Sequence, residues 1–358
     1  MNQFFEHVTL KGVPGLCLLL AVGAVLGLAA QAVGAPLPFM LGGLFAGLLV
    51  VPALNRVGLA HMFPRPLRGF FVAVIGVLIG ATFTPDLLSV LPSLPLTLAA
   101  MTVFVPCAHA VGYVVCRRVG GYDHQTALFC AMPGGLIEGI AFGQEVGGDV
   151  RALTLHHFAR VISVAVLVPI LFFVWKGEAV GSAVGQSLAG KNDGLDVAVV
   201  VLIAAIGLLL GRVLKLPAGQ LLGAMVLAAA VQASGIWQLG APNWLLNVAQ
   251  LIVGAGLAYQ MGGASLRMAG RVVMTSLTMV IVVLGFTVAV AILLAGRTSM
   301  GVEPLILSFS PGGVAEMGLI ALSLQISPVI VVAHHTYRIV LTVLVASVLR
   351  RQLLRNVA

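Results

Sequence analysis

Apolar residues along this chain form long, nearly continuous runs rather than an alternating pattern. Runs of about 20 residues have the length of a helix that spans a bilayer, whereas strands of an outer-membrane barrel alternate polar and apolar residues. The pattern therefore predicts an all-α polytopic membrane protein. Its twelve runs lie near 14–34, 36–53, 67–90, 94–116, 124–146, 151–175, 193–213, 217–237, 245–266, 272–295, 303–325 and 328–349.

The fifth run of each half is interrupted by the triplet Pro-Gly-Gly, at 133–135 and at 311–313. Proline lacks a backbone donor and glycine frees the backbone, so each triplet is expected to break a helix. Two half-helices could then form a re-entrant hairpin that enters and leaves on one side of the membrane. The alternative is one broken helix that crosses fully.

The distribution of Lys and Arg favours the re-entrant hairpins, because basic residues gather on the cytoplasmic side of a membrane protein. If all twelve runs cross, twelve bases lie on one side and five on the other; with two hairpins the split becomes fourteen to three. We therefore expect about ten transmembrane helices plus two re-entrant hairpins, with both termini cytoplasmic. The expected location is the bacterial inner membrane.

The polar residues around the two triplets recur at one constant offset in the numbering, from 138 to 316, from 156 to 334 and from 160 to 338. This recurrence predicts two homologous repeats, 1–175 and 195–358, joined by a Gly- and Ser-rich linker at 176–194. Five crossings in each repeat, an odd number, would invert one repeat relative to the other, as in many secondary transporters. The recurring residues are Pro133, Gly134, Gly135, Glu138, His156, His157 and Arg160, and Pro311, Gly312, Gly313, Glu316, His334, His335 and Arg338.

Composition agrees with a membrane location and argues against nucleic acid as a partner. The chain of 358 residues is 60% hydrophobic and 8% charged, with a mean hydropathy of +1.12, whereas soluble domains carry about 25% charged residues. The net charge of +8 comes from bases that stand singly or in pairs at the ends of apolar runs, as loop anchors do. The four cysteines form no CxxC pair, so no disulfide or zinc framework is expected.

Ionisable residues inside a bilayer are costly, and those that are present are candidates for function. Arg160 and Arg338, with the half-helix N-termini that follow Gly134-Gly135 and Gly312-Gly313, suit a carboxylate or another anion. Pro133 and Pro311 would shape the hairpins. The expected coupling residues, which would exchange protons, are Glu138, Glu316, His156, His334, His157 and His335.

Helical periodicity places His156 with Arg160, and His334 with Arg338, on one helix face, since residues four apart are neighbours. Two alternatives stay open: coupling by Na⁺, and buried Glu–Arg pairs that are purely structural. Adjacent histidines do not converge on one ion, so no metal is expected. His109 has no counterpart in the second half, where residue 287 is Thr, and is expected to be a packed side chain.

With these residues identified, the chain resembles the AbrB family of bacterial membrane proteins over nearly its whole length. The family's members carry two labels, AbrB family transcriptional regulator and ammonia monooxygenase. The resemblance thus implies an effect on gene expression or an oxygenase reaction. The chain has no helix-turn-helix or basic patch for DNA, and its ligands make no convincing copper or iron site.

The favoured function is a secondary transporter of a small anionic solute, coupled to H⁺ or Na⁺ and acting on gene expression only indirectly. A membrane-embedded sensor or regulator is the second hypothesis, and a membrane monooxygenase is the third. No cofactor and no enzymatic activity are expected. The expected partners are the lipid bilayer and a small solute, and a homodimer is compatible with the apolar helix faces.

Overall fold

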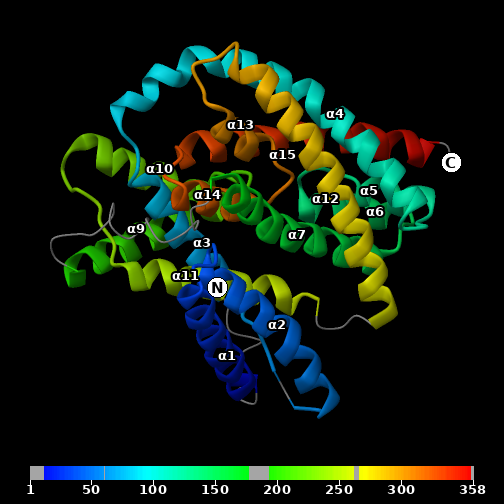
Figure 1. The fold of residues 1–358 in the computed structure, drawn as a ribbon, viewed down its shortest axis with the longest axis horizontal. Coiled ribbons are helices and arrows are strands. Elements are labelled where there is room, and N and C mark those ends of the chain that lie inside the picture. Colours follow the sequence, from blue (N-terminus) through cyan, green and yellow to red (C-terminus); the bar gives the residue numbers. More distant parts are fainter. Residues whose placement is uncertain (1–11, 60, 177–192, 262–265, 356–358) are drawn as a thin grey trace. The chain divides into compact units, whose positions relative to one another are not determined.

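The computed structural model describes residues 12–59, 61–176, 193–261 and 266–355, and in these ranges every regular element is a helix (Figure 1). This confirms the predicted all-α class. The elements are α1 (Val13–Ala32), α2 (Pro38–Arg56), α3 (Arg65–Gly80), η3 (Pro85–Ser93), α4 (Leu94–Arg118), α5 (His124–Cys130), α6 (Leu136–Glu145), α7 (Val150–Lys176), α9 (Asp193–Val213), α10 (Gly219–Ser234), α11 (Asn243–Tyr259), α12 (Leu266–Ala295), α13 (Val302–Phe309), α14 (Val314–Ser323) and α15 (Pro328–Arg355).

Seven described helices are long and apolar enough to cross a bilayer: α1, α2, α4, α7, α9, α12 and α15. Their presence supports the polytopic membrane assignment. Helices α3, α10 and α11 have 16 or 17 residues, near the lower limit for a spanning helix. The count of ten crossings requires these three to cross as well, and it stays a prediction, as does the inversion of the repeats.

One predicted run ends earlier than its apolar residues suggested. The run at 67–90 is helical only as far as Gly80, and a turn and the 3₁₀ helix η3 lead from there into α4. The hydroxyl of Thr82 donates a hydrogen bond of 2.7 Å to the carbonyl of Ile79, which satisfies part of the open end of α3. Pro85 and Pro92 lack backbone donors, and so they hinder an α-helix in the next segment.

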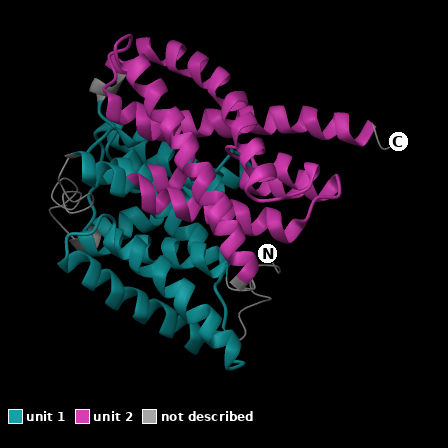
Figure 2. Ribbon diagram, turned by 45° about the vertical axis from the view of Figure 1, so that its right-hand side comes forward, with its two compact units in different colours: residues 1–85, 169–263, 318–329 teal, residues 86–168, 264–317, 330–358 magenta. Residues whose placement is uncertain are grey.

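The chain divides into two compact units, shown in different colours in Figure 2. Unit 1 comprises 1–85, 169–263 and 318–329, and unit 2 comprises 86–168, 264–317 and 330–358. Each unit therefore takes helices from both halves of the sequence, so the units do not coincide with the proposed repeats. The repeat boundaries stay a prediction, and most of the predicted linker, 177–192, lies outside the described residues.

Unit 1 is held together by glycines at helix crossings. A Cβ atom on Gly42 of α2 would collide with the backbone of α1 at Gly23 and Gly27. In the second half, a Cβ atom on Gly223 of α10 would collide in the same way with α9 at Gly207. Because glycine has no side chain, the backbones approach closely, as in other membrane helix pairs.

The two halves also exchange contacts within unit 1. Gly76 of α3 packs against the carbonyl of Leu221 in α10, and Gly254 of α11 packs against the carbonyl of Met40 in α2. Gly76 and Gly254 stand at the same offset from each other as the recurring polar positions do. These small residues thus serve helix packing.

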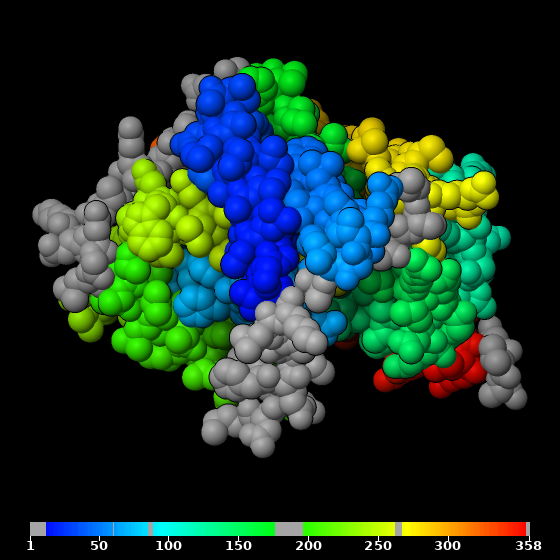
Figure 3. All heavy atoms as spheres, turned by 90° about the horizontal axis from the view of Figure 1, so that it is seen from below, coloured from blue at the N-terminus to red at the C-terminus, as the bar shows by residue number. Residues whose placement is uncertain are grey.

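Helix α1 lies on the surface of unit 1 beside α2, as the space-filling view shows (Figure 3). Its large apolar side chains Val25 and Leu28 are 64% and 57% exposed. Such side chains suit contact with lipid tails, because a helix in a bilayer gains nothing from hiding them from hydrocarbon.

Unit 2 contains one long helix from each half, α4 and α12, that pack against each other. The rings of Phe104 in α4 and Phe286 in α12 stack with centroids 4.9 Å apart, and Phe309 at the end of α13 meets Phe104 edge-on at 5.2 Å. Aromatic pairs in these arrangements add to the stabilisation from burial. This cluster holds the broken helix of the second half against the long helix of the first half.

Candidate functional site

The predicted helix breaks are present at both triplets. Helices α5 and α6 are separated at 131–135, and α13 and α14 at 310–313. The helices that follow the breaks begin at Leu136 and Val314, which stand at the same offset as the recurring polar positions. Gly135 adopts a left-handed conformation, with φ of 63°, directly before α6. Glycine reaches this conformation without steric cost, which explains the residue type at that position.

The first broken segment folds back on itself. The hydroxyl of Thr126, at the start of α5, accepts a hydrogen bond of 2.8 Å from the backbone N–H of Asp149, which follows α6. Gly143 of α6 also packs on Phe129 of α5. The two ends of the segment therefore lie together, so it is a helical hairpin.

The second broken segment is distributed differently. Residues Val314–Met317 of α14 belong to unit 2, whereas the remainder of α14, from Gly318, belongs to unit 1. The two triplets thus share a local sequence but differ in how the helix after the break is held.

Both recurring arginines bind the carbonyl groups freed by the breaks. Arg160 is 4% exposed and donates to the carbonyl of Met132, and Arg338 is 1% exposed and donates to those of Ser310 and Gly312. The last carbonyls of a helix lack partners within the helix and carry partial negative charge, so a guanidinium is a favourable cap there. The Nε–H group of each arginine has no acceptor among the described residues.

The second histidine of each pair lies beside the break. His335 approaches the carbonyl of Leu307 at 2.9 Å through Nε2, and its Nδ1 lies 3.0 Å from a guanidinium nitrogen of Arg338. Because the guanidinium can only donate, Nδ1 accepts, and the proton of the neutral ring is on Nε2. His157 occupies the matching position near the carbonyl of Phe129, with its ring against Gly139, but without normal hydrogen-bond geometry.

The first histidine of each pair is bound by a hydroxyl from the long helix of the other half. His156 in α7 lies 3.2 Å from the hydroxyl of Ser276 in α12, and His334 in α15 lies 2.9 Å from that of Thr97 in α4. The expectation that His334 accompanies Arg338 therefore needs correction, because His335 is the neighbour that Arg338 contacts. Positions three and four residues apart both share a helix face, so periodicity alone did not separate them.

Sequence reasoning missed one pair of residues. His109 of α4 contacts the carbonyl of Leu128 at 2.8 Å, and Thr287 of α12, at the equivalent position of the second half, donates to the carbonyl of Phe309 at 3.3 Å. Both residues satisfy carbonyls near the end of the first half-helix. His and Thr are different residue types, although both bind a carbonyl here. A search for identical residues at the constant offset does not detect such a pair.

Glu138 and Glu316 occupy the first turn of α6 and of α14, as predicted. There they lie near the positive end of the helix dipole. Glu138 is half-buried and Glu316 is 3% exposed. The carboxylate of Glu316 lies directly over Gly313, where any side chain would collide with it. A larger residue at this position would thus force the carboxylate to move.

The two copies meet inside unit 2. A Cβ atom on Gly134 would lie 3.4 Å from the hydroxyl of Thr342, and one on Gly135 would lie 3.2 Å from Val343, both in α15 just after Arg338. The first break therefore rests on the helix that carries the second arginine.

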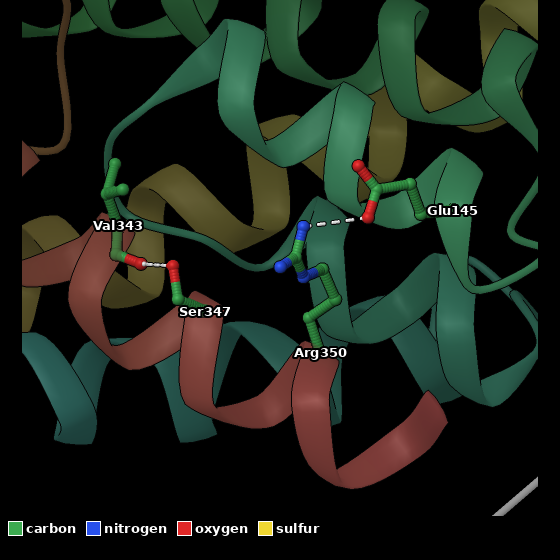
Figure 4. A network of polar contacts seen from close by, with 4 residues as sticks. All are labelled: Glu145, Val343, Ser347 and Arg350. Atoms are coloured by element: carbon green, nitrogen blue, oxygen red, sulfur yellow. Dashed lines mark hydrogen bonds and ion pairs between the residues drawn. The ribbon is translucent and has the colours of Figure 1, made fainter. Parts of the chain in front are cut away.

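An ion pair connects the same elements at the surface. Arg350 of α15 donates to the carboxylate of Glu145, at the end of α6, over 2.7 Å, and Ser347 donates to the carbonyl of Val343 (Figure 4). The guanidinium also lies over the ring of Phe142 at 4.8 Å. Exposed pairs contribute roughly 0.2–1 kcal/mol, so this contact orients the hairpin more than it stabilises it.

Among the described residues, no three His, Cys, Asp or Glu side chains converge on a point where a metal ion could be held. His156, His334 and His335 bind hydroxyl groups, carbonyl groups or arginine, as the preceding distances show. The arrangement is thus a buried network of charged and polar groups around two helix breaks.

Comparison with known proteins gives consistent matches over most of the chain. Residues 39–354 match the family model described as "Transition state regulatory protein AbrB". A protein of Escherichia coli (strain K12) named "Putative regulator AbrB" is 24% identical over 326 residues, which is 90% of each chain. A Bacillus subtilis (strain 168) protein named "Uncharacterized protein YhjN" is 25% identical over 288 residues, covering 75% of this chain and 74% of that one.

Proposed function

The chain belongs to the AbrB family, and we propose that it is an inner-membrane secondary transporter of a small solute that carries an anionic group. Transport would be coupled to H⁺ or Na⁺, with both termini in the cytoplasm. The observation that carries the proposal is the pair of helix breaks in unit 2, each capped by a buried arginine. Broken helices with buried charges are typical of the substrate sites of secondary transporters.

The charge on the two arginines supports an anionic solute. The partners described for Arg160 and Arg338 are backbone carbonyls and one neutral imidazole, none of which carries a net charge. A guanidinium keeps its positive charge in such surroundings, since it does not deprotonate in proteins. Its free Nε–H groups, together with the N-termini of α6 and α14, would bind a carboxylate.

Coupling is assigned to the acidic residues and the histidines. Glu138 and Glu316 lie in the first turn of the helix after each break, and proton binding there would alter the charge at the helix N-termini that are proposed to bind the solute. The four histidines would pass protons between the carboxylates, since imidazole both donates and accepts. Sodium coupling would use the same carboxylates together with the carbonyls freed at the breaks.

The test is thermal stabilisation of the detergent-purified protein by a panel of small organic anions, followed by uptake into proteoliposomes with an imposed H⁺ or Na⁺ gradient. A ligand of the native state raises the melting temperature by mass action. We expect stabilisation by at least one anion, and we expect Arg160→Ala and Arg338→Ala to abolish it. Arg350→Ala is the matched control, because Arg350 lies on α15 away from the breaks.

Two outcomes would contradict the proposal. The first is an anion that stabilises the wild type and both arginine variants equally, because its site would then lie elsewhere. The second is an anion that binds through both arginines but shows no gradient-driven uptake. Saturable binding without uptake is what a membrane-embedded sensor predicts, and the name of the Escherichia coli relative favours that second candidate.

A further inference from the structure

A second polar feature of unit 2 is a pocket of about 340 Å³ on its surface, formed by the loop between α4 and α5, the residue before α7 and the first turns of α12. This volume lies in the range of small-ligand sites, about 300–1,000 Å³. None of the recurring site residues lines it. The lining residues that determine its chemistry are Tyr122, Asp123, Thr126, Asp149, Arg267 and Arg271.

Charges of opposite sign line this pocket without neutralising one another. Asp123 and Asp149 come from the two ends of the first hairpin, whereas Arg267 and Arg271 stand one turn apart on α12. Within the described ranges, neither arginine forms an ion pair with either aspartate. All four side chains are exposed.

The two aspartates that line the pocket, Asp123 and Asp149, are fixed in place by hydrogen bonds. Asp123 accepts bonds from the backbone N–H and the hydroxyl of Thr126, at 2.8 and 2.6 Å, and Asp149 accepts bonds from the N–H groups of residues 151 and 152. Burial would raise the pKa of Asp123, but the bonds from Thr126 outweigh it and hold this pKa below its ordinary value. Asp123 is therefore a carboxylate at neutral pH.

The floor of the pocket connects it with the buried site. Tyr122 is 8% exposed, and its hydroxyl lies beside Thr275 but meets no partner in normal hydrogen-bond geometry among the described residues. The ring of Tyr122 meets the ring of His156 edge-on, with centroids 5.8 Å apart. Tyr122 therefore links the lining of the pocket to His156, one of the recurring polar residues.

We propose that this pocket binds a small zwitterion that carries both an ammonium and a carboxylate group, as a free amino acid does. The ammonium would face Asp123 and Asp149, and the carboxylate would bind Arg267 and Arg271, whose fork of N–H groups matches a carboxylate. The inference deepens the proposed function, on which it rests, by naming the class of solute that enters.

The test is isothermal titration of the full-length protein in lipid-free detergent with glycine, L-alanine, L-serine and L-leucine. Propionate and ethylamine are the matched probes that lack one of the two charged groups. We expect at least one amino acid to bind, and to bind at least tenfold more tightly than propionate and ethylamine. Binding of all four amino acids no better than propionate would overturn the proposal.

Variants locate the site. Arg271→Gln and Asp149→Asn should each weaken amino-acid binding at least tenfold, and asparagine keeps the helix cap while removing the charge. Arg297→Gln is the control, because Arg297 follows the opposite end of α12. Circular dichroism and the melting temperature confirm that each variant folds. Undiminished binding in both Arg271→Gln and Asp149→Asn would place the amino acid elsewhere and overturn the assignment.

The headgroup of phosphatidylethanolamine carries the same two kinds of charge. A second arm of the experiment therefore distinguishes binding of this lipid from binding of a free amino acid. The protein is placed in nanodiscs of phosphatidylcholine with or without phosphatidylethanolamine. Thermal stabilisation by phosphatidylethanolamine that is lost in Arg271→Gln, without amino-acid binding in detergent, would show a lipid site and overturn the solute assignment.

Amino-acid binding in this pocket without uptake into proteoliposomes would refute transport but not the pocket. Uptake of a simple anion without amino-acid binding would support transport and refute the assignment of the pocket.

Discussion

The two compact units solve the same problem, the packing of helices from both halves of the chain, by opposite means. In unit 1, glycines bring the backbones into contact, as at Gly42 and Gly223. In unit 2, helix ends and side chains are joined by hydrogen bonds from buried charged residues. All but three of the buried polar side chains among the described residues lie in unit 2, the exceptions being Asp196, Gln250 and Ser323.

The difference shows where this protein accepts an energetic cost. Close packing of small residues gains dispersion energy and buries no polar side chain that would need a hydrogen-bond partner. These helix contacts therefore stabilise unit 1 without an offsetting desolvation cost. Buried charged groups are expensive in a bilayer and persist only when they are paired or functional. The comparison therefore locates the close glycine packing in unit 1 and most of the buried polar side chains of the described residues in unit 2.

The largest effect is expected from truncation of Arg338. Arg338→Ala would leave the carbonyl of Gly312 without its described donor and would remove one of the two donors of the carbonyl of Ser310, which also accepts from the N–H of Gly312. An unsatisfied buried group costs about 1–3 kcal/mol. We expect a loss of about 3 kcal/mol in the free energy of unfolding, and a smaller loss of about 2 kcal/mol for Arg160→Ala, which frees one described carbonyl, that of Met132. Denaturant titration in detergent measures both values.

Two comparisons sharpen this prediction. Arg338→Lys should recover only part of the loss, because an ammonium group lacks the planar fork that reaches two carbonyls. Equal and small losses for Arg338→Ala and the exposed Arg350→Ala would show that the buried network of unit 2 contributes little to stability.

An intermediate effect is expected in unit 1. Gly223→Ala would force its Cβ into the backbone of α9 at Gly207, and overpacking of this kind costs about 1–3 kcal/mol. The melting temperature and denaturant titration would show the loss. Gly285→Ala, in the interior of α12, has open space around its Cβ and should be neutral or more stable by up to about 1 kcal/mol.

If Gly223→Ala and Gly285→Ala behaved alike, the close backbone contact between α9 and α10 would not be a determinant of stability. The claim that close glycine packing stabilises unit 1 would then be wrong, whatever the outcome for the arginine variants.

The smallest effect concerns the first half-helix of each broken segment, α5 and α13. Asp123 caps α5 through Thr126, whereas Gly301, at the matching position before α13, has no side chain to do so. Asp123→Ala should therefore cost about 1 kcal/mol, and Asp123→Asn much less. Because the folded state lowers the pKa of Asp123 below 3.8, its contribution is present above that pH and is lost as pH falls through the folded value.

The measurement is the melting temperature of wild type and Asp123→Asn between about pH 6 and about pH 3. The difference between them should shrink toward the acidic end, since only the wild type loses a charge there. A difference that stayed constant over this range would show that the carboxylate is not the stabilising group.

Much of the site was predictable from local sequence, and some of it was not. The Pro-Gly-Gly triplets identified both breaks, and the constant offset identified which polar residues accompany them, because proline and glycine act on their own backbone. The equivalence of His109 and Thr287 escaped notice, since a hydrogen bond to a carbonyl can come from either residue type. The choice of His335 rather than His334 beside Arg338 depended on helix rotation, which periodicity leaves unresolved.

The sequence by itself determined the class of protein, most of the helices, the two breaks and the recurring polar residues, because these follow from apolar runs, from the constant offset and from the backbone chemistry of proline and glycine. Only the tertiary structure decided that helices of both halves mix in each unit, that the arginines bind carbonyls and that opposite charges line one surface pocket. Such partners are far apart in the chain. Which side chains meet is determined by the rotation and close approach of packed helices, and these depend on contacts made by the whole unit.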